Sequence, residues 1–156
     1  MKIREAVLAD FPIFLELNSE VQSLHAQAVP KLFKPSSEMS MTGADFEKLL
    51  NDPAIKFFIA EIDGQAEGYV FTQIWDRPEN PYRYGSKMLY INHLAVRSGA
   101  RGKGIGKALV NRARTQATEL GISRVELDVW TFNEKAIAFF AAQGFGIYNQ
   151  RMTLAP

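Results

Sequence analysis

Three glycines alternate with other residues, most of them basic, in one short segment of this 156-residue chain, Arg101-Gly102-Lys103-Gly104-Ile105-Gly106-Lys107. The segment follows the apolar stretch Leu94-Ala95-Val96 and precedes a helical pattern that ends at Gly121. Glycine has no Cβ, so backbone N–H groups there can approach an anion closely. The first turn of a helix adds unpaired N–H donors and the positive end of its dipole. The arrangement predicts a site for a phosphate or pyrophosphate.

Two common phosphate motifs do not fit this loop. A P-loop carries Lys-Ser or Lys-Thr after its last glycine, whereas Gly106 is followed by Lys107 and Ala108. The Rossmann motif places two residues between its second and third glycines, whereas a single residue separates Gly104 from Gly106. An ordinary turn with solvated basic side chains is the alternative interpretation of the loop.

The composition is that of an ordinary globular protein. Apolar residues make up 47% and charged residues 22% of the chain, and its length suits a single domain over residues 1–156. The chain has no cysteine, which excludes disulfides, thiolate nucleophiles and zinc–thiolate sites. We expect no metal site. The longest apolar run, Ala136–Ala142, is far shorter than the roughly 20 residues that span a bilayer, so we expect no membrane contact and a cytoplasmic location.

The net charge of +1 conceals a local asymmetry. Residues 97–118 hold six basic side chains and no acidic one, whereas the rest of the chain carries 12 basic and 17 acidic residues, a net charge of −5. The total charge argues against a nucleic-acid binder, because it offers no footprint for a long polyanion. The local charge favours one compact anion.

Strand and helix patterns are mixed along the chain. β-branched and aromatic residues at alternating positions predict strands over six segments: Ile3–Val7, Ile55–Ile62, Glu67–Trp75, Met88–Val96, Ile122–Trp130 and Tyr148–Leu154. Helical spacing and capping residues predict helices after Asp10 and over three further segments: Thr42–Leu50, Gly104–Leu120 and Asn133–Gln143. This order is typical of an α+β or mixed-sheet α/β fold.

Together these residues resemble the GNAT superfamily of acyl-CoA-dependent N-acetyltransferases. The family signature Arg/Gln-x-x-Gly-x-Gly/Ala is matched by Arg101, Gly104 and Gly106. A second family motif is matched by Asn133, Ala136, Gly144 and Phe145. The resemblance implies one N-acetyltransferase domain over residues 1–156. Its expected fold is a mixed, mostly antiparallel sheet of about six to seven strands, flanked by about four helices, with splayed fourth and fifth strands.

The resemblance also implies a cofactor site for acetyl-CoA. Backbone amides of residues 101–107 are expected to hold the pyrophosphate, and Leu94, Ala95 and Val96 to pair with the pantetheine arm. Asn133, Ala136 and Phe140 complete the expected cofactor-binding set. Asn133 is equally well explained as the N-cap of the helix that follows it.

The implied reaction is direct attack of a primary amine on the thioester, which requires a base because the amine is protonated near neutral pH. Asp128 matches a position where many relatives carry a glutamate, and His93 lies on the strand that feeds the glycine loop. Glu126 is a weaker third candidate, and the sequence does not rank the three. The family often places a tyrosine at the position of Phe140 to protonate the departing thiolate, and Phe140 has no hydroxyl. Tyr90 and Tyr148 are conceivable substitutes.

The acceptor is expected to be a small-molecule or peptide amine that is partly apolar. The residues expected to line its site are His25, Pro30, Phe33, Phe57, Trp75, Tyr82, Arg83 and Tyr84. Glu38 and Asp45 are further candidates, which could hold a cation of the acceptor. A catalytically weak CoA-binding sensor is the main alternative function, and a nucleic-acid binder using residues 97–114 is a third. We expect a monomer or a homodimer.

Overall fold

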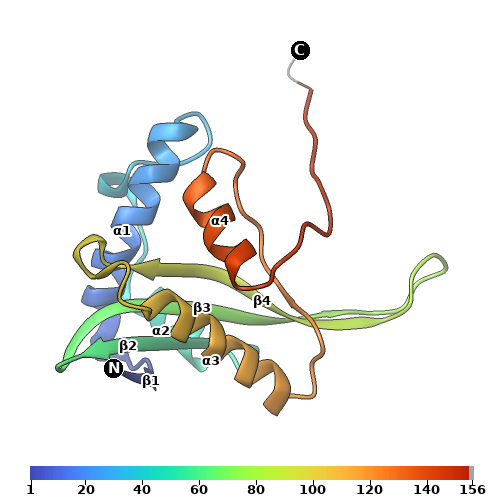
Figure 1. The fold of residues 1–156 in the computed structure, drawn as a ribbon, viewed down its shortest axis with the longest axis horizontal. Coiled ribbons are helices and arrows are strands. Elements are labelled where there is room, and N and C mark those ends of the chain that lie inside the picture. Colours follow the sequence, from blue (N-terminus) through green and yellow to red (C-terminus); the bar gives the residue numbers. More distant parts are fainter. Residues whose placement is uncertain (155–156) are drawn as a thin grey trace.

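One mixed sheet of five strands organises the computed structural model, which describes residues 1–154 (Figure 1). The strands are β1 (Lys2–Glu5), β2 (Ile55–Ile62), β3 (Gln65–Arg77), β4 (Ser86–Val96) and β5 (Val125–Glu126). They lie in chain order; neighbours are antiparallel except β4 and β5, which are parallel. The predicted fold class is confirmed, although residues 1–154 form fewer strands than the six to seven expected.

The helices pack on both faces of the sheet. They are α1 (Phe11–Ala28), α2 (Gly43–Asn51), α3 (Ile105–Glu119) and α4 (Glu134–Ala142). Alternate strand residues point to opposite faces, so the sheet builds two apolar layers. The layer under α1 and α2 includes Phe14, Phe46, Phe57 and Tyr69. The layer under α3 includes Phe58, Val70, Leu89, Ile105 and Leu109.

The predicted C-terminal strand is wrong for the described residues. Residues 146–154 form no strand and lead away from the sheet (Figure 1), and their large apolar side chains are exposed: Ile147, Tyr148, Met152 and Leu154. The predicted strand over 122–130 is also shorter, because β5 pairs with β4 only through Leu89–Val125 and Tyr90–Glu126. Beyond Tyr90, β4 and β5 are no longer paired, which gives the splay of these two strands that the family resemblance implies.

An ion-pair cluster fixes the start of α1 to the sheet. Asp10 precedes the helix, and its carboxylate accepts two hydrogen bonds of 2.7 Å from the Arg4 guanidinium and one of 2.8 Å from the Val7 N–H. Arg4 also donates to Glu61 on β2 at 2.6 Å. Asp10 is buried, and the Arg4 guanidinium holds the pKa of its carboxyl below the ordinary value. The cluster therefore sets where α1 crosses the sheet.

We expect Asp10→Ala to lower the free energy of unfolding by about 2–3 kcal/mol at pH 7, because charge-assisted hydrogen bonds are lost and Arg4 keeps only Glu61. A carboxyl whose pKa is lowered on folding stabilises the protein above its unfolded pKa of about 3.9 and ceases to do so as pH falls further. Denaturant unfolding should therefore show a difference in free energy of unfolding between wild type and variant that is full at pH 7 and narrows as pH falls below about 4. Glu47→Ala, an exposed carboxylate on α2, is the control. Equal stability at pH 7 would contradict the assignment.

Candidate active site

The glycine loop connects β4 to α3 in an unusual backbone conformation. Gly102 and Gly104 both have φ +80°, in the left-handed region that favours glycine, and Gly104 is the N-cap of α3. A Cβ at either position would meet no atom within 4 Å. The first helical bond runs from the Ala108 N–H to the Gly104 carbonyl, at 3.0 Å. The N–H groups of residues 105–107 therefore precede the helical ladder, beside open space.

The other two residues at this turn have structural roles as well. Ile105 is 1% exposed and anchors the start of α3 in the core. A Cβ on Gly106 would lie 3.0 Å from Cζ of Phe139 on α4. The third glycine is therefore explained by close packing of the two helices as much as by an anion.

The end of β4 has one free backbone edge. The Arg97 N–H donates to the Glu67 carbonyl on β3 at 2.8 Å. Because backbone groups alternate along a strand, those of Leu94 and Val96 point to the other side, from which β5 has diverged. The Leu94 and Val96 side chains pack toward α3, and Ala95 is buried under α1. Packing and an exposed backbone edge thus coexist at Leu94 and Val96, whereas the backbone groups of Ala95 point to β3 and do not contribute to the free edge as predicted.

A bulge lies in β4 before this edge. His93 pairs with Phe71 and Ile91 pairs with Thr72, which leaves Asn92 as the extra residue. A bulge changes the direction of the strand and of the side chains that follow it. It accompanies the separation of β4 from β5.

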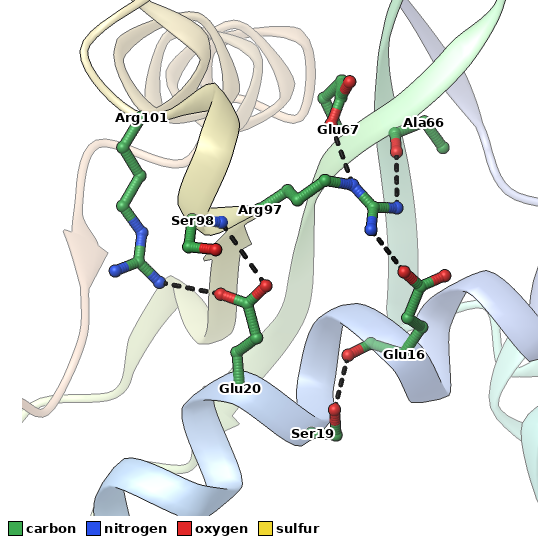
Figure 2. A network of polar contacts seen from close by, with 8 residues as sticks. All are labelled: Glu16, Ser19, Glu20, Ala66, Glu67, Arg97, Ser98 and Arg101. Atoms are coloured by element: carbon green, nitrogen blue, oxygen red, sulfur yellow. Dashed lines mark hydrogen bonds and ion pairs between the residues drawn. The ribbon is translucent and has the colours of Figure 1, made fainter.

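Carboxylates from α1 pair with the arginines around the loop (Figure 2). Glu20 accepts from Arg101 Nη2 at 3.1 Å and from the Ser98 N–H at 3.4 Å. Arg97 pairs with Glu16 and, at 2.9 Å, with Glu67. Lys103 and Lys107 form no ion pair within residues 1–154. The positive charge available to an anion thus comes mainly from the two lysines.

These ion pairs could not be predicted from the local charge pattern. Residues 97–118 hold no acidic side chain, and Glu20 lies 81 positions before Arg101 in the chain. No local pattern connects two residues at that separation. Arg101 also donates from Nε to the Val96 carbonyl at 3.1 Å, so its side chain folds back over the free edge of β4.

We expect Glu20→Gln to tighten acetyl-CoA binding about two- to fivefold, because Glu20 holds Arg101 across the edge that a ligand would pair with. The size follows from exposed ion pairs, which contribute about 0.2–1 kcal/mol. Isothermal titration at low and high salt measures the change. Glu16→Gln removes the same charge from the same helix but leaves Arg101 paired, so it should change affinity less. Weaker binding by Glu20→Gln would show that the pair supports the site instead.

His93 lies on the face covered by α1. Its Nδ1 is 3.5 Å from the hydroxyl of Tyr69, which donates to Asn18 Oδ1 at 3.1 Å. Solvent reaches the ring, yet surrounding protein and the second imidazole, His25, hold the pKa of His93 below its ordinary value. His93 is therefore neutral at pH 7 and able to accept a proton.

Asp128 lies on the same face, two residues beyond the end of β5 in an exposed position. Burial, together with the nearby Asp128 carboxylate, raises the pKa of Tyr90 to about 12. The Tyr90 ring stacks on Trp75 with centroids 4.2 Å apart. Glu126 pairs with Arg124 and is less available as a base than Asp128.

The second motif positions α4. Asn133 is the N-cap, because its Oδ1 accepts from the Ala136 N–H at 3.2 Å. Phe140 packs against Phe145 with centroids 5.6 Å apart. The structure therefore confirms the capping role of Asn133, and its side-chain NH₂ has no partner within residues 1–154.

The predicted acceptor walls need correction. Phe57 is 2% exposed and belongs to the core. Tyr82 and Tyr84 are about nine-tenths exposed on the hairpin that projects away from the helices (Figure 1), because the β3–β4 ladder extends beyond the helices. His25 and Phe33 instead contact a cluster that the sequence did not indicate: His25 meets Phe132 at 5.5 Å, and Phe33 meets Trp130 at 5.2 Å.

Neither a metal-binding group nor a membrane-spanning helix is found in the part of the chain that the structure describes. Within residues 1–154, no group of three histidine, aspartate or glutamate side chains is placed to hold a metal ion. In the same range, no helix is both long enough and apolar enough to cross a membrane.

Comparison with known proteins decides the family. The model of the acetyltransferase (GNAT) family matches residues 20–145, which include the glycine loop, Asp128 and Asn133. The chain belongs to the GNAT acetyltransferase family. The match covers strands β2 to β5 and helices α2, α3 and α4 in full.

Several curated relatives are similar over part of their length. The L-2,4-diaminobutyric acid acetyltransferase of Nocardia farcinica (strain IFM 10152) is 32% identical over 84 residues, which are 54% of this chain and 40% of the relative. Rat N-acetyltransferase 8B is 35% identical over 103 residues, 65% of this chain and 45% of the relative. The chain thus spans less than half the length of these relatives.

Solved structures show the same fold. The tetramutant of BH1408 from Bacillus halodurans superposes with a TM-score of 0.94 at 24% identity, covering 100% of both chains. The aminoglycoside N-acetyltransferase AAC(6')-Iy in complex with CoA has a TM-score of 0.74 at 18% identity, covering 99% of this chain and 98% of the other. At these identities the likeness concerns the fold alone.

Proposed function

We propose that this GNAT protein transfers an acetyl group from acetyl-CoA to the primary amine of a small molecule or peptide, by direct attack in a ternary complex. The observation that carries the proposal is the pair of left-handed glycines at the start of α3, beside the free edge of β4. The solved relative in complex with CoA supports the choice of cofactor.

The loop and the strand edge would hold different parts of the cofactor. The N–H groups of residues 105–107 and the side chains of Lys103 and Lys107 suit the pyrophosphate. The outward backbone groups of Leu94 and Val96 suit the amides of the pantetheine arm. Arg101 would release the Val96 carbonyl as the cofactor binds. Asn133, at the start of α4, has a side-chain NH₂ to donate to the same arm.

The chemistry requires a neutral amine beside the thioester carbonyl. We assign Asp128 as the group that attracts the ammonium and accepts its proton, directly or through water, with His93 as the alternative base. The amine nitrogen forms a bond to the carbonyl carbon, the carbon–sulfur bond breaks, and the sulfur leaves with its electron pair. Because a thiol has a pKa near 8.5, the thiolate is a tolerable leaving group without an acid. Phe140 therefore need not be replaced by another proton donor.

A CoA-binding sensor is the second candidate, and the missing hydroxyl at Phe140 favours it. A nucleic-acid binder is disfavoured, because Arg97 and Arg101 are already paired with carboxylates.

Thiol release from acetyl-CoA, measured with and without a panel of primary amines, separates these functions. An acetyltransferase releases CoA only when an acceptor is present, and mass spectrometry finds the acetylated amine. Tight CoA binding without release from any amine would instead support the sensor.

A further inference from the structure

We propose that the acceptor is a primary amine with a single positive charge, attached to an aromatic or similarly flat apolar ring. The inference rests on the proposed acetyl transfer and concerns the face around Asp128. It comes from two features of that face: its aromatic side chains, and the small number of carboxylates that have no basic partner.

Two groups of aromatic side chains occur near Asp128, one on β3 and β4 and one that begins two residues after it in the sequence. Tyr90 lies near the Asp128 carboxylate and stacks on Trp75 at an interplanar angle of 13°. Trp130 follows Asp128 by two residues and meets Phe33 edge-on at 5.2 Å. The Asp128 carboxylate thus acts on Tyr90, and Trp130, two residues further along the chain, belongs to a second aromatic group.

The second group joins two distant parts of the chain. His25 at the end of α1 contacts Phe33 at 4.9 Å and Phe132 at 5.5 Å, and Trp130 stacks near Phe132 at 6.0 Å. We define His25, Phe33, Trp130 and Phe132 as the aromatic cluster. It connects the end of α1 with the segment before α4, which lie side by side in Figure 1.

The aromatic cluster is not part of the protein core. Trp130 is 41% exposed, and Phe33 and Phe132 are only half-buried. Neither buried apolar layer of the sheet includes a member of the cluster. Exposed aromatic rings beside a carboxylate suit a ligand that combines a flat apolar body with a cation, because ring stacking and cation–π attraction act together.

The charges of this face limit the acceptor to one ammonium. Asp128 forms no ion pair within residues 1–154, whereas Glu126 is paired with Arg124. Arg77 lies over the Trp75 ring at 5.4 Å, and Arg151 is near enough to act on Tyr90. A second or third ammonium would meet these guanidinium groups instead of a carboxylate. The face therefore disfavours polyamines and aminoglycosides.

The experiment measures acetyl transfer by the full chain, with acetyl-CoA as the donor. The acceptors all carry a primary amine and differ in the group to which that amine is attached. The panel is 2-phenylethylamine, isobutylamine, 1,4-diaminobutane, an aminoglycoside and a glycine-terminated peptide. We expect kcat/KM for 2-phenylethylamine to exceed that of every other member by about fivefold or more, since a ring-stacking contact reaches that size and the ammonium is common to the whole panel.

Two variants test whether the aromatic cluster causes the preference for 2-phenylethylamine. Phe33→Leu and Trp130→Leu should raise KM for 2-phenylethylamine about fivefold or more while KM for acetyl-CoA stays within twofold. Tyr82→Leu, on the exposed hairpin, is the matched control and should change neither constant. Thermal unfolding of each variant checks that it is folded. The comparison of acceptors uses the wild-type protein, so it does not depend on the folding of any variant.

The outcomes separate the inference from the proposed function. A preference for 1,4-diaminobutane, the aminoglycoside or the peptide would overturn the proposal that the acceptor is a ring-bearing monocation. It would not contradict the proposed acetyl transfer. Equal rates for 2-phenylethylamine and isobutylamine would also overturn it. CoA release with none of the amines, despite CoA binding, would overturn both.

Discussion

Replacing both Gly102 and Gly104 with alanine is expected to weaken acetyl-CoA binding about a hundredfold, and replacing Gly104 alone about tenfold. A residue with a Cβ loses roughly 1–2 kcal/mol in the left-handed region, and both glycines have φ +80°. Because the loop faces open space, the variant loop relaxes to negative φ in the ligand-free protein. Binding must then restore the strained conformation, so the strain appears as lost affinity, which isothermal titration measures.

Gly99→Ala is the matched control for this prediction. Gly99 lies three residues from Gly102 in the same connection, has no positive φ, and would also place its Cβ in open space. We expect its affinity and thermal stability to equal those of the wild type. Unchanged acetyl-CoA affinity in the double variant would show that the left-handed turn does not hold the cofactor.

The second large effect is expected at Asp128. Asp128→Asn keeps the shape of the side chain, but it removes the charge and the basicity. We expect kcat to fall about 10²–10⁴-fold, the usual contribution of a general base. The affinity for acetyl-CoA should not change. Because the variant must wait for spontaneously neutral amine, its rate should rise about tenfold per pH unit up to the amine pKa near 10.

His93→Gln distinguishes the two base candidates. His93 is neutral at pH 7 and carries no charge to attract an ammonium, whereas Asp128 is a carboxylate, so we expect a loss of less than tenfold. Steady-state kinetics of both variants at pH 7 and 9 decide between them. A large loss in His93→Gln with a small one in Asp128→Asn would reverse the assignment.

Local patterns in the sequence were sufficient for the elements that carry the cofactor loop. The predicted strand over Ile55–Ile62 has the observed bounds, and the helix predicted to end before Gly121 ends at Glu119. Gly121 has φ +65°, as the end of a helix requires. Alternation and glycine punctuation are local signals, and here the tertiary structure agrees with them.

Contacts between distant segments could not be predicted in the same way. Glu20 pairs with Arg101, and Phe33 with Trp130, only because α1 crosses the sheet beside the end of β4. The segment 148–154 alternates like a strand, yet it pairs with no other strand among the described residues. Phe57 looked like a residue of the acceptor wall, but register places it in the core under α1 and α2.

CoA release from acetyl-CoA tests the proposed acetyl transfer most directly, when it is measured for the wild type and the Gly102→Ala/Gly104→Ala variant with 2-phenylethylamine present or absent. We expect release and acetylated amine only when wild type and amine are combined, and about a hundredfold higher KM for acetyl-CoA in the variant. Equal acetyl-CoA dependence in the two proteins, or no release by the wild type with any primary amine, would contradict the proposal.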